Sequence, residues 1–196
     1  QGYTFDTVLN GFAATVKADD LDKLVEIPGV TLVEPDTIVY ASEDITTSTD
    51  ANFEQISPMM NTSNSFLGIE KLWDEGIEGQ GIKVAVLDTG IDANHPEFQG
   101  IYKGGKNFVP HTGSDYARPR ADDDASETSP LDRPSNRPEF NANGNSFYTS
   151  HGTHVAGTIA AIGENQYGIK GIAPRVDLYA YRVLGAYGSG STSGII

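Results

Sequence analysis

Apolar and polar residues alternate along the first 40 residues in the pattern of short β-strands. The alternation breaks at Asn10-Gly11, a pair that favours the tight turn of a β-hairpin. A helical pattern follows, in which Leu21, Leu24 and Val25 share one face and Pro28-Gly29 ends the helix. A small α+β unit of this size buries too little surface to be stable by itself. The elements expected here are strands at 3–9 and 12–16, a helix at 18–26, and strands at 30–33 and 37–40.

Longer apolar segments follow from about residue 66. Residues 82–87 are β-branched and nearly all apolar, which is typical of a strand buried on both faces of a parallel sheet. Residues 150–161 predict a helix of small residues, with Ser150 as its candidate N-cap. With a short helix at 69–75 and an apolar strand at 176–184, the order of elements predicts an α/β fold with a doubly wound, mostly parallel sheet.

Two polar stretches interrupt these units. Residues 42–65 are rich in Ser, Thr, Asp and Asn without periodicity, which predicts an exposed linker that contains a processing site. Residues 110–148 predict a solvated surface insertion, with a calcium site at Asp122–Asp124 as the alternative. The expected organisation is a unit at 1–41, a linker at 42–65 and a larger domain at 66–196.

The charge balance narrows the classes of function. The 196 residues carry 13 Lys and Arg against 27 Asp and Glu, a formal net charge of −14, and such a surface repels nucleic acids. The sequence has no cysteine, which excludes disulfides, cysteine-ligated zinc and thiol catalysis. No apolar run reaches the roughly 18 residues of a membrane segment. The N-terminus has neither an initiator Met nor a signal-peptide pattern, so we expect the chain to be part of a longer protein.

Asp88 lies at the carboxyl end of the predicted strand 82–87. Ligand-binding and catalytic groups gather at that edge of open α/β sheets. Two alternative roles are open to this carboxylate, because it could cap the next turn or belong to the Asp-Thr-Gly of an aspartic protease. The aspartic protease role needs another copy of the motif or a symmetric dimer, and an all-β chain; the sequence has one copy and an α/β pattern.

His151 opens the predicted helix 150–161, where the helix dipole favours a neutral imidazole that can accept a proton. A buried aspartate such as Asp88 would fix its tautomer. Zinc binding by His151 and His154 is the alternative, although no Glu lies between them as in helical zinc hydrolases. His154 is otherwise expected to be a packed structural residue, and His95 and His111 to be loop residues.

These segments resemble the aspartate and histidine blocks of the subtilisin-like serine proteases. The first block is similar to Val84-Ala85-Val86-Leu87-Asp88-Thr89-Gly90-Ile91-Asp92 with His95-Pro96-Glu97-Phe98, and the second to His151-Gly152-Thr153-His154-Val155-Ala156-Gly157-Thr158. They occur in the family's order of Asp, His and then Ser. Residues 171–184 and 188–190 extend the resemblance, and the architecture is similar to that of the Vpr-type minor extracellular proteases.

The resemblance implies a serine endopeptidase that is secreted as a zymogen, is extracellular or associated with the cell wall, and cleaves polypeptides. Asp88 would orient His151, and His151 would act as general base toward a serine. That serine and the oxyanion-hole Asn are expected beyond residue 196, so residues 1–196 alone should be inactive. The substrate-binding residues that the resemblance implies are Leu184, Gly188, Ser189, Gly190 and Thr192.

Residues 1–41 resemble the back half of the family's inhibitory prodomain, a ferredoxin-like α+β unit, which makes this segment an expected intramolecular inhibitor. No catalytic cofactor is implied. Calcium is common in the family, with Glu97 in the position of a ligand and residues 162–167 where other ligands would lie. The alternative function is a non-catalytic pseudoprotease or a chaperone-like binding module, although intact Asp88 and His151 argue against it.

Overall fold

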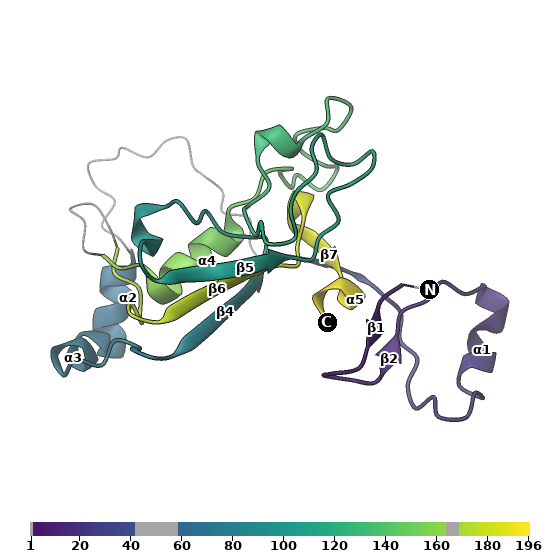
Figure 1. The fold of residues 1–196 in the computed structure, drawn as a ribbon, viewed down its shortest axis with the longest axis horizontal. Coiled ribbons are helices and arrows are strands. Elements are labelled where there is room, and N and C mark those ends of the chain that lie inside the picture. Colours follow the sequence, from purple (N-terminus) through teal and green to yellow (C-terminus); the bar gives the residue numbers. More distant parts are fainter. Residues whose placement is uncertain (1, 42–58, 164–168) are drawn as a thin grey trace.

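The computed structural model describes residues 2–41, 59–163 and 169–196, and its centre is a parallel sheet of three strands in the order β4-β6-β5 (Figure 1). Helix α4 packs along one face of this sheet, which confirms the predicted α/β class. The three strands point the same way, so Asp88, Asn107 and Arg182 end at a common edge. The elements are β4 (Lys83–Asp88), β5 (Tyr102–Asn107), β6 (Asp177–Arg182) and α4 (His151–Ala160).

Apolar side chains between α4 and the sheet form the core. The prediction that the first core strand is buried on both faces is wrong, because Val86 is buried while its neighbour Leu87 is 53% exposed. The reason is that β4 lies at the edge of the described sheet and α4 covers one of its faces. The buried core residues are Val86, Ile91, Phe98, Ala125, Ala156, Ala160, Val176, Leu178 and Ala180.

The N-terminal unit contains a hairpin and a helix, both shorter than predicted. Gly11 pairs with Phe5 inside the hairpin ladder, so the expected two-residue turn at Asn10-Gly11 is wrong and residues 6–10 form a longer loop. No strand forms at 30–33. None of residues 2–41 is buried, so the alternating pattern lacks the packing that would lengthen its strands. The elements are β1 (Thr4–Phe5), β2 (Gly11–Phe12), η1 (Ala18–Asp20) and α1 (Leu21–Leu24).

The last strand of the N-terminal unit pairs with the far end of the chain. Strand β3 (Ile38–Tyr40) runs antiparallel to β7 (Ser189–Ser191), with Val39 opposite Gly190. A short 3-10 turn, η5 (Ala186–Gly188), leads into β7, and α5 (Thr192–Ile195) follows it. Figure 1 shows this small sheet between the N-terminal hairpin and the parallel sheet, so it joins the two predicted units.

Two helices precede the first core strand. Helix α3 (Ile69–Asp74) confirms the predicted short helix, and its Trp73 indole N–H donates to the carbonyl of Ile172 at 3.0 Å. Helix α2 (Met59–Leu67) begins inside the segment predicted as linker, so that prediction is wrong for residues 59–65. The rest of the linker, residues 42–58, with the expected processing site, lies outside the described residues.

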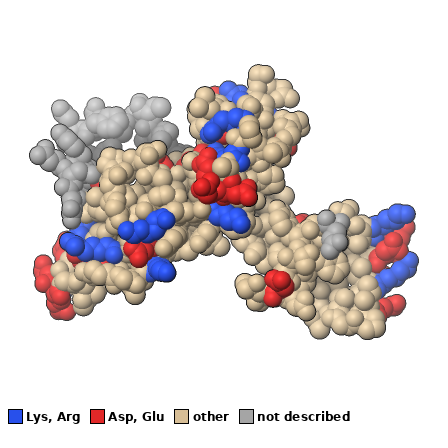
Figure 2. Space-filling model, viewed as in Figure 1, with Lys and Arg blue, Asp and Glu red and all other residues tan. Residues whose placement is uncertain are grey.

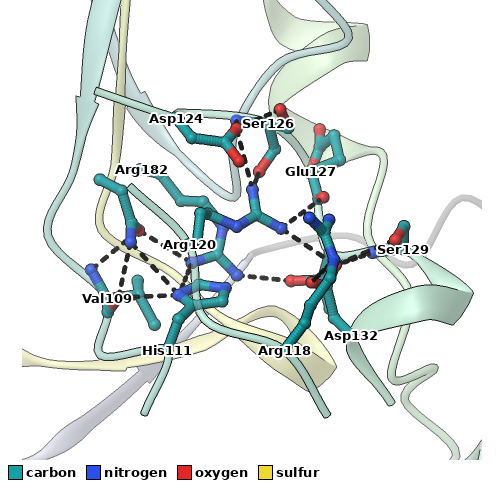
Figure 3. Close-up of polar contacts among 12 residues, drawn as sticks. Val109, His111, Arg118, Arg120, Asp124, Ser126, Glu127, Ser129, Asp132 and Arg182 are labelled. Atoms are coloured by element: carbon teal, nitrogen blue, oxygen red, sulfur yellow. Dashed lines mark hydrogen bonds and ion pairs between the residues drawn. The ribbon is translucent and has the colours of Figure 1, made fainter. Parts of the chain in front are cut away.

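The insertion at 110–148 is largely exposed, as predicted, but part of it is packed: Arg118, Arg120, Asp124 and Asp132 form a network of ion pairs (Figure 3). Asp132 is fully buried, and its two carboxylate oxygens lie 2.9 Å from Arg118 Nε and 3.0 Å from Arg120 Nη2. Arg182, at the end of β6, is also fully buried and donates to Thr128 Oγ1 at 2.5 Å. Polar composition did not indicate this packed part, because it does not show which charged side chains meet inside the fold. A short 3-10 turn, η4 (Pro130–Asp132), contributes Asp132 to this network.

Candidate active site

Asp88 and His151 lie in direct contact at the carboxyl edge of the sheet. Asp88 ends β4, His151 begins α4, and His151 Nδ1 is 2.8 Å from Asp88 Oδ1 and 2.9 Å from Oδ2. A carboxylate only accepts hydrogen bonds, so in the neutral imidazole Nδ1 carries the hydrogen and Nε2 is the nitrogen with the lone pair. Asp88 is 8% exposed and also accepts from the Thr89 N–H at 2.6 Å, which holds the carboxylate in place. The pair can therefore accept a proton at Nε2 from a neighbouring donor.

The close approach of α4 to β4 depends on a glycine. A Cβ at Gly152 would lie 2.2 Å from the carbonyl oxygen of Gly90 and 3.1 Å from Asp88 Cβ, so no larger residue fits. The Gly152 N–H donates to Thr89 Oγ1 at 2.9 Å, and Thr89 is fully buried. The residue that follows the histidine and the residue that follows the aspartate thus tie the two elements together.

The N-terminus of α4 is capped by Glu127 rather than by Ser150. Ser150 occupies the predicted N-cap position, but its side chain makes no capping bond. Instead, Glu127 Oε1 accepts from both N and Oγ1 of Thr153 at 2.9 Å, and Oε2 accepts from Thr149 Oγ1 at 2.6 Å. A carboxylate here satisfies a free backbone N–H and opposes the positive end of the helix dipole. Sequence reasoning missed Glu127 because it lies in the insertion, far from the helix in sequence.

Of the other three histidines, His95 and His111 lie in loops as predicted, while His154 differs from its predicted role. His154 is exposed, so the prediction of a packed structural residue is wrong. His95 is an exposed loop residue whose Nδ1 accepts from the Glu97 N–H at 3.3 Å. His111 is in a loop but only 4% exposed; burial, with the nearby charges of Arg182 and Arg120, lowers its pKa to about 4.

The residues predicted to bind substrate lie along the chain from the end of β6 to α5, where β3 is docked. The Ala41 N–H donates to the Gly188 carbonyl at 2.8 Å, and the Thr192 N–H donates to the Thr37 carbonyl at 2.9 Å. Leu184 is 7% exposed, and its Cδ2 would lie 3.1 Å from a Cβ at Gly190. The five predicted residues are Leu184, Gly188, Ser189, Gly190 and Thr192.

Asp36 adds a contact that the sequence did not suggest. Its carboxylate accepts from the Ser193 N–H at 2.9 Å and from the Ser193 hydroxyl at 2.6 Å. These bonds, the hydroxyl first, hold the pKa of Asp36 below its ordinary value. Ser189 and Ser191 are also engaged, since the Ser189 hydroxyl donates to the Ala186 carbonyl and Ser191 Oγ accepts from the Gly194 N–H.

Glu97 and Asn64 reach the two ends of residues 163–170. Glu97 is 6% exposed and its Oε2 accepts from the Gly163 N–H at 2.7 Å. Asn64 is 2% exposed and donates from Nδ2 to the Lys170 carbonyl at 3.0 Å, while its buried Oδ1 has no partner among the described residues. A Cβ at Gly163 would lie 2.7 Å from Lys170 Cβ, so the two ends are adjacent. Of the predicted calcium loop 162–167, residues 164–167 lie outside the described residues.

The described residues contain no group of three or more His, Cys, Asp or Glu side chains that could hold a metal ion. Within the acidic run, the Asp124 carboxylate accepts from the Ser126 N–H at 3.0 Å and lies 3.5 Å from Arg120 Nη1. In the described ranges, no helix has the length and apolar character needed to cross a membrane. On the face drawn in Figure 2, acidic and basic side chains are interspersed and no continuous basic surface forms.

Known protein families share the segments that carry this geometry. Residues 79–196 match the Subtilase family, and residues 1–42 match the Peptidase inhibitor I9 family. The minor extracellular protease Vpr of Bacillus subtilis (strain 168) is 38% identical over 197 residues, which cover 98% of this chain and 21% of that protein. Subtilisin E of the same strain is 35% identical over 188 residues, 96% of this chain and 37% of the relative.

A third relative aligns with less of the chain. The major intracellular serine protease of Bacillus subtilis (strain 168) is 40% identical over 127 residues, 64% of this chain and 31% of that protein. The chain thus spans between about a fifth and two fifths of the length of these relatives. Because the family match covers more than half of the chain and includes both Asp88 and His151, the chain belongs to the subtilase family, with an inhibitor I9 segment at its N-terminus.

Proposed function

We propose that the protein containing this chain is a secreted serine endopeptidase made as a zymogen. The observation that carries this proposal is the His151–Asp88 pair, with Nδ1 bound to the carboxylate and Nε2 left to accept a proton. Its position at the carboxyl edge of a parallel sheet is where α/β enzymes assemble their active sites. The relative Vpr, an extracellular protease, supports secretion, and cell-wall association is an extension of the same proposal.

In this reaction the serine is supplied from outside residues 1–196. Its hydroxyl proton moves to His151 Nε2 as the oxygen attacks the peptide carbonyl. Asp88 stays ionised and stabilises the imidazolium, because Oδ1 and Oδ2 both lie within 2.9 Å of Nδ1. The imidazolium then donates the same proton to the departing amine nitrogen, which completes acyl transfer without a net change at His151.

Strand β3 occupies the edge where an extended polypeptide substrate would add. It pairs antiparallel with β7, and the Gly188 carbonyl accepts the Ala41 N–H. Strand addition gives affinity through backbone groups, so it makes few demands on substrate sequence. We infer that residues 36–41 are held as an inhibitory, product-like strand, and that processing takes place in the linker 42–65 that follows it. Residues 1–41 supplied in trans to the mature enzyme should inhibit it, and no inhibition at micromolar concentration would contradict this role.

Calcium is proposed at the Glu97–Asn64 position. Calcium prefers carboxylate and amide carbonyl oxygens; Glu97 offers the former, and Asn64 Oδ1, which has no partner among the described residues, offers the latter. Asn64→Asp tests the site, because it keeps an oxygen in place and adds charge. Calorimetric titration with calcium should give tighter binding in this variant and weaker binding in Glu97→Gln. Equal heats of calcium binding in the unchanged protein and the two variants would show that neither residue is a calcium ligand.

Asp88→Asn tests the catalytic proposal in the protein that also carries the serine. The amide cannot accept from Nδ1–H in the same way, so kcat should fall by roughly 10⁴. Asp92→Asn is the matched control, because exposed Asp92 accepts from the Asn94 N–H, a bond that an asparagine oxygen can also accept. Similar activity in the two variants would contradict the assignment of Asp88.

A fluorophosphonate probe separates a protease from a pseudoprotease. The probe labels only an activated serine, and peptide mapping identifies it. A label on a serine outside residues 1–196 supports the proposed mechanism. Absence of label on folded protein freed of residues 1–41 would favour a non-catalytic binding module.

A further inference from the structure

The turn η5, which leads into the β7 edge where substrate is proposed to add, contains a strained tyrosine. In the part of the chain that the structure describes, Tyr187 is the one non-glycine residue with a positive φ, at φ 60° and ψ 16°. A bulky side chain is rarely found in this left-handed region, so the surroundings must hold it there. Tyr187 precedes Gly188, whose carbonyl accepts the Ala41 N–H. The strained residue therefore lies next to the Gly188 carbonyl, the backbone group that accepts a hydrogen bond from a strand added at this edge.

Two contacts from the insertion hold Tyr187. Its hydroxyl donates to the Pro138 carbonyl at 2.7 Å. Its ring stands edge-on to Phe147, with centroids 5.2 Å apart and an interplanar angle of 82°. Phe147 is 2% exposed, so this second anchor is part of the packed interior of the insertion. Both partners belong to residues 110–148.

A second tyrosine of the insertion braces the same turn. The Tyr116 hydroxyl accepts from the Ala186 N–H at 3.3 Å, and a Cβ at Gly185 would lie 2.8 Å from that oxygen. The Tyr116 ring lies 4.1 Å from the ring of His111. His111 Nδ1 is 3.3 Å from Arg182 Nη1 at the end of β6. A continuous set of contacts thus runs from the buried end of β6 through the insertion to the turn at 185–188.

The turn is closed on itself, so its anchors fix the edge strand. The Gly185 N–H donates to the Ser189 carbonyl at 2.7 Å, and the Gly188 N–H donates to the Gly185 carbonyl at 3.1 Å. A shift of Tyr187 would therefore move the Gly188 carbonyl and the start of β7 together.

We propose that Tyr187 is a positioning residue for extended polypeptide substrates, through which the 110–148 insertion fixes the Gly188 carbonyl and the β7 edge. This inference rests on the proposed function and deepens it. It gives the insertion a role in recognising substrate residues that lie well before the scissile bond. A short substrate does not reach β7. The insertion should therefore affect long substrates and spare short ones.

Tyr187→Phe tests this proposal in the protein that carries the serine, because it removes only the hydroxyl that donates to Pro138. Losing one neutral hydrogen bond should raise KM for a tetrapeptide or longer anilide by about five-fold. kcat for that substrate, and both constants for a single-residue ester, should stay unchanged. Tyr148→Phe is the matched control, since the Tyr148 hydroxyl accepts from Arg133 Nε and does not touch the turn.

Tyr187→Asn is the second variant. Asparagine tolerates the left-handed region, so it removes both anchors without adding strain. Its effect on KM for long substrates should exceed that of Tyr187→Phe. Equal losses for long and short substrates, or a Tyr187→Phe enzyme that matches Tyr148→Phe, would overturn the proposal.

Hydrogen exchange on the 196-residue chain gives a readout that needs no catalysis. The Ala41 amide should exchange about five-fold faster in Tyr187→Phe than in the unchanged chain, and at the unchanged rate in Tyr148→Phe. Unaltered exchange at Ala41 would overturn the positioning role. If the unchanged protein is not labelled by the fluorophosphonate probe and cleaves no peptide, the proposed function is contradicted. The exchange rate of the Ala41 amide still decides whether Tyr187 fixes the strand edge.

Discussion

Single residues from separate segments of the chain hold His151 and the first turn of its helix. Asp88 binds Nδ1, Thr89 accepts the N–H of Gly152, and Glu127 accepts the N–H of Thr153. The first two are adjacent at the end of β4, whereas Glu127 comes from the insertion. The carboxylate of Glu127 also opposes the helix dipole that would disfavour an imidazolium at His151. Glu127, a residue of the insertion, therefore stabilises the helix turn that carries the His151 imidazole.

Glu127→Gln should lower the free energy of unfolding by about 1–2 kcal/mol, because a neutral amide is a weaker partner for the Thr153 N–H and hydroxyl. Urea denaturation of the 196-residue chain measures the change. Glu139→Gln is the matched control, since Glu139 is an exposed glutamate of the same insertion. Equal denaturation midpoints in the two variants would show that Glu127 is not a significant cap.

At the scale of elements, the distance between α4 and β4 is set by glycine. Gly152 faces the backbone of Gly90. A Cβ at Gly157, in the same helix, would meet none of the described residues within 4 Å apart from the backbone of the helix itself. Substitutions at Gly152 and Gly157 therefore distinguish the effect of close packing on stability from the effect of helix propensity.

Gly152→Ala should destabilise the chain by about 1–3 kcal/mol, because the added methyl group forces α4 away from the loop after Asp88. Gly157→Ala should stabilise it by roughly 0.5–1 kcal/mol, because alanine loses less entropy in a helix. Urea denaturation gives both values, and the NMR resonance of the His151 Nδ1 proton reports the contact with Asp88. A Gly152→Ala protein that keeps both its stability and this resonance would contradict the packing argument.

The β3–β7 pair is the second element-scale contact, and Asp36 anchors one end of it. Asp36→Asn should speed the exchange of the Ser193 amide by roughly five-fold, a modest effect because exposed charged contacts are individually weak. Its pKa is lowered by Ser193, so the contact is complete above the ordinary aspartate pKa near 3.8 and is lost as the pH falls through the lowered value. Asp22→Asn, on exposed α1, is the control. The same exchange rate in both variants would remove Asp36 as an anchor.

Across the whole molecule, the insertion connects the parallel sheet to the edge where β3 is docked. Arg182 ends the central strand and lies against His111 of the insertion (Figure 3). It also donates to Thr128 and is fully buried. His111 lies between this arginine and Tyr116. A proton added to His111 would place a second positive charge beside Arg182 in a buried site.

Acid should therefore destabilise the folded chain through His111. The unfolded histidine binds a proton near pH 6.5, while the folded one does so only near its lowered pKa of about 4, so stability is complete above pH 6.5 and falls as the pH drops toward 4. The loss reaches at most about 3 kcal/mol. Urea denaturation at several pH values measures it, with His111→Gln as the variant that cannot titrate. Identical pH slopes in the two proteins would exclude His111 as the source.

The order of elements and the catalytic candidates could be read from the sequence because they depend on local patterns. The apolar run before Asp88 and the small-residue helix after Ser150 both formed close to their predicted bounds. The strand predicted at 30–33 does not form, because alternation indicates a strand only where a partner and a packed face are present. The predicted role of His154 was wrong for a related reason, since its exposure, like the burial of the loop residue His111, is a property of the packed fold.

The sequence by itself determined the fold class, the presence of Asp88 and His151, and an N-terminal segment like an inhibitory prodomain. The tertiary structure decided that His151 Nδ1 faces Asp88, that Glu127 caps the histidine helix, and that β3 pairs with β7. It also decided that part of the polar insertion is packed and that the insertion holds Tyr187 in a left-handed conformation. These features join residues far apart in the chain, and such contacts leave no periodic signal because each depends on where two separately folded segments meet.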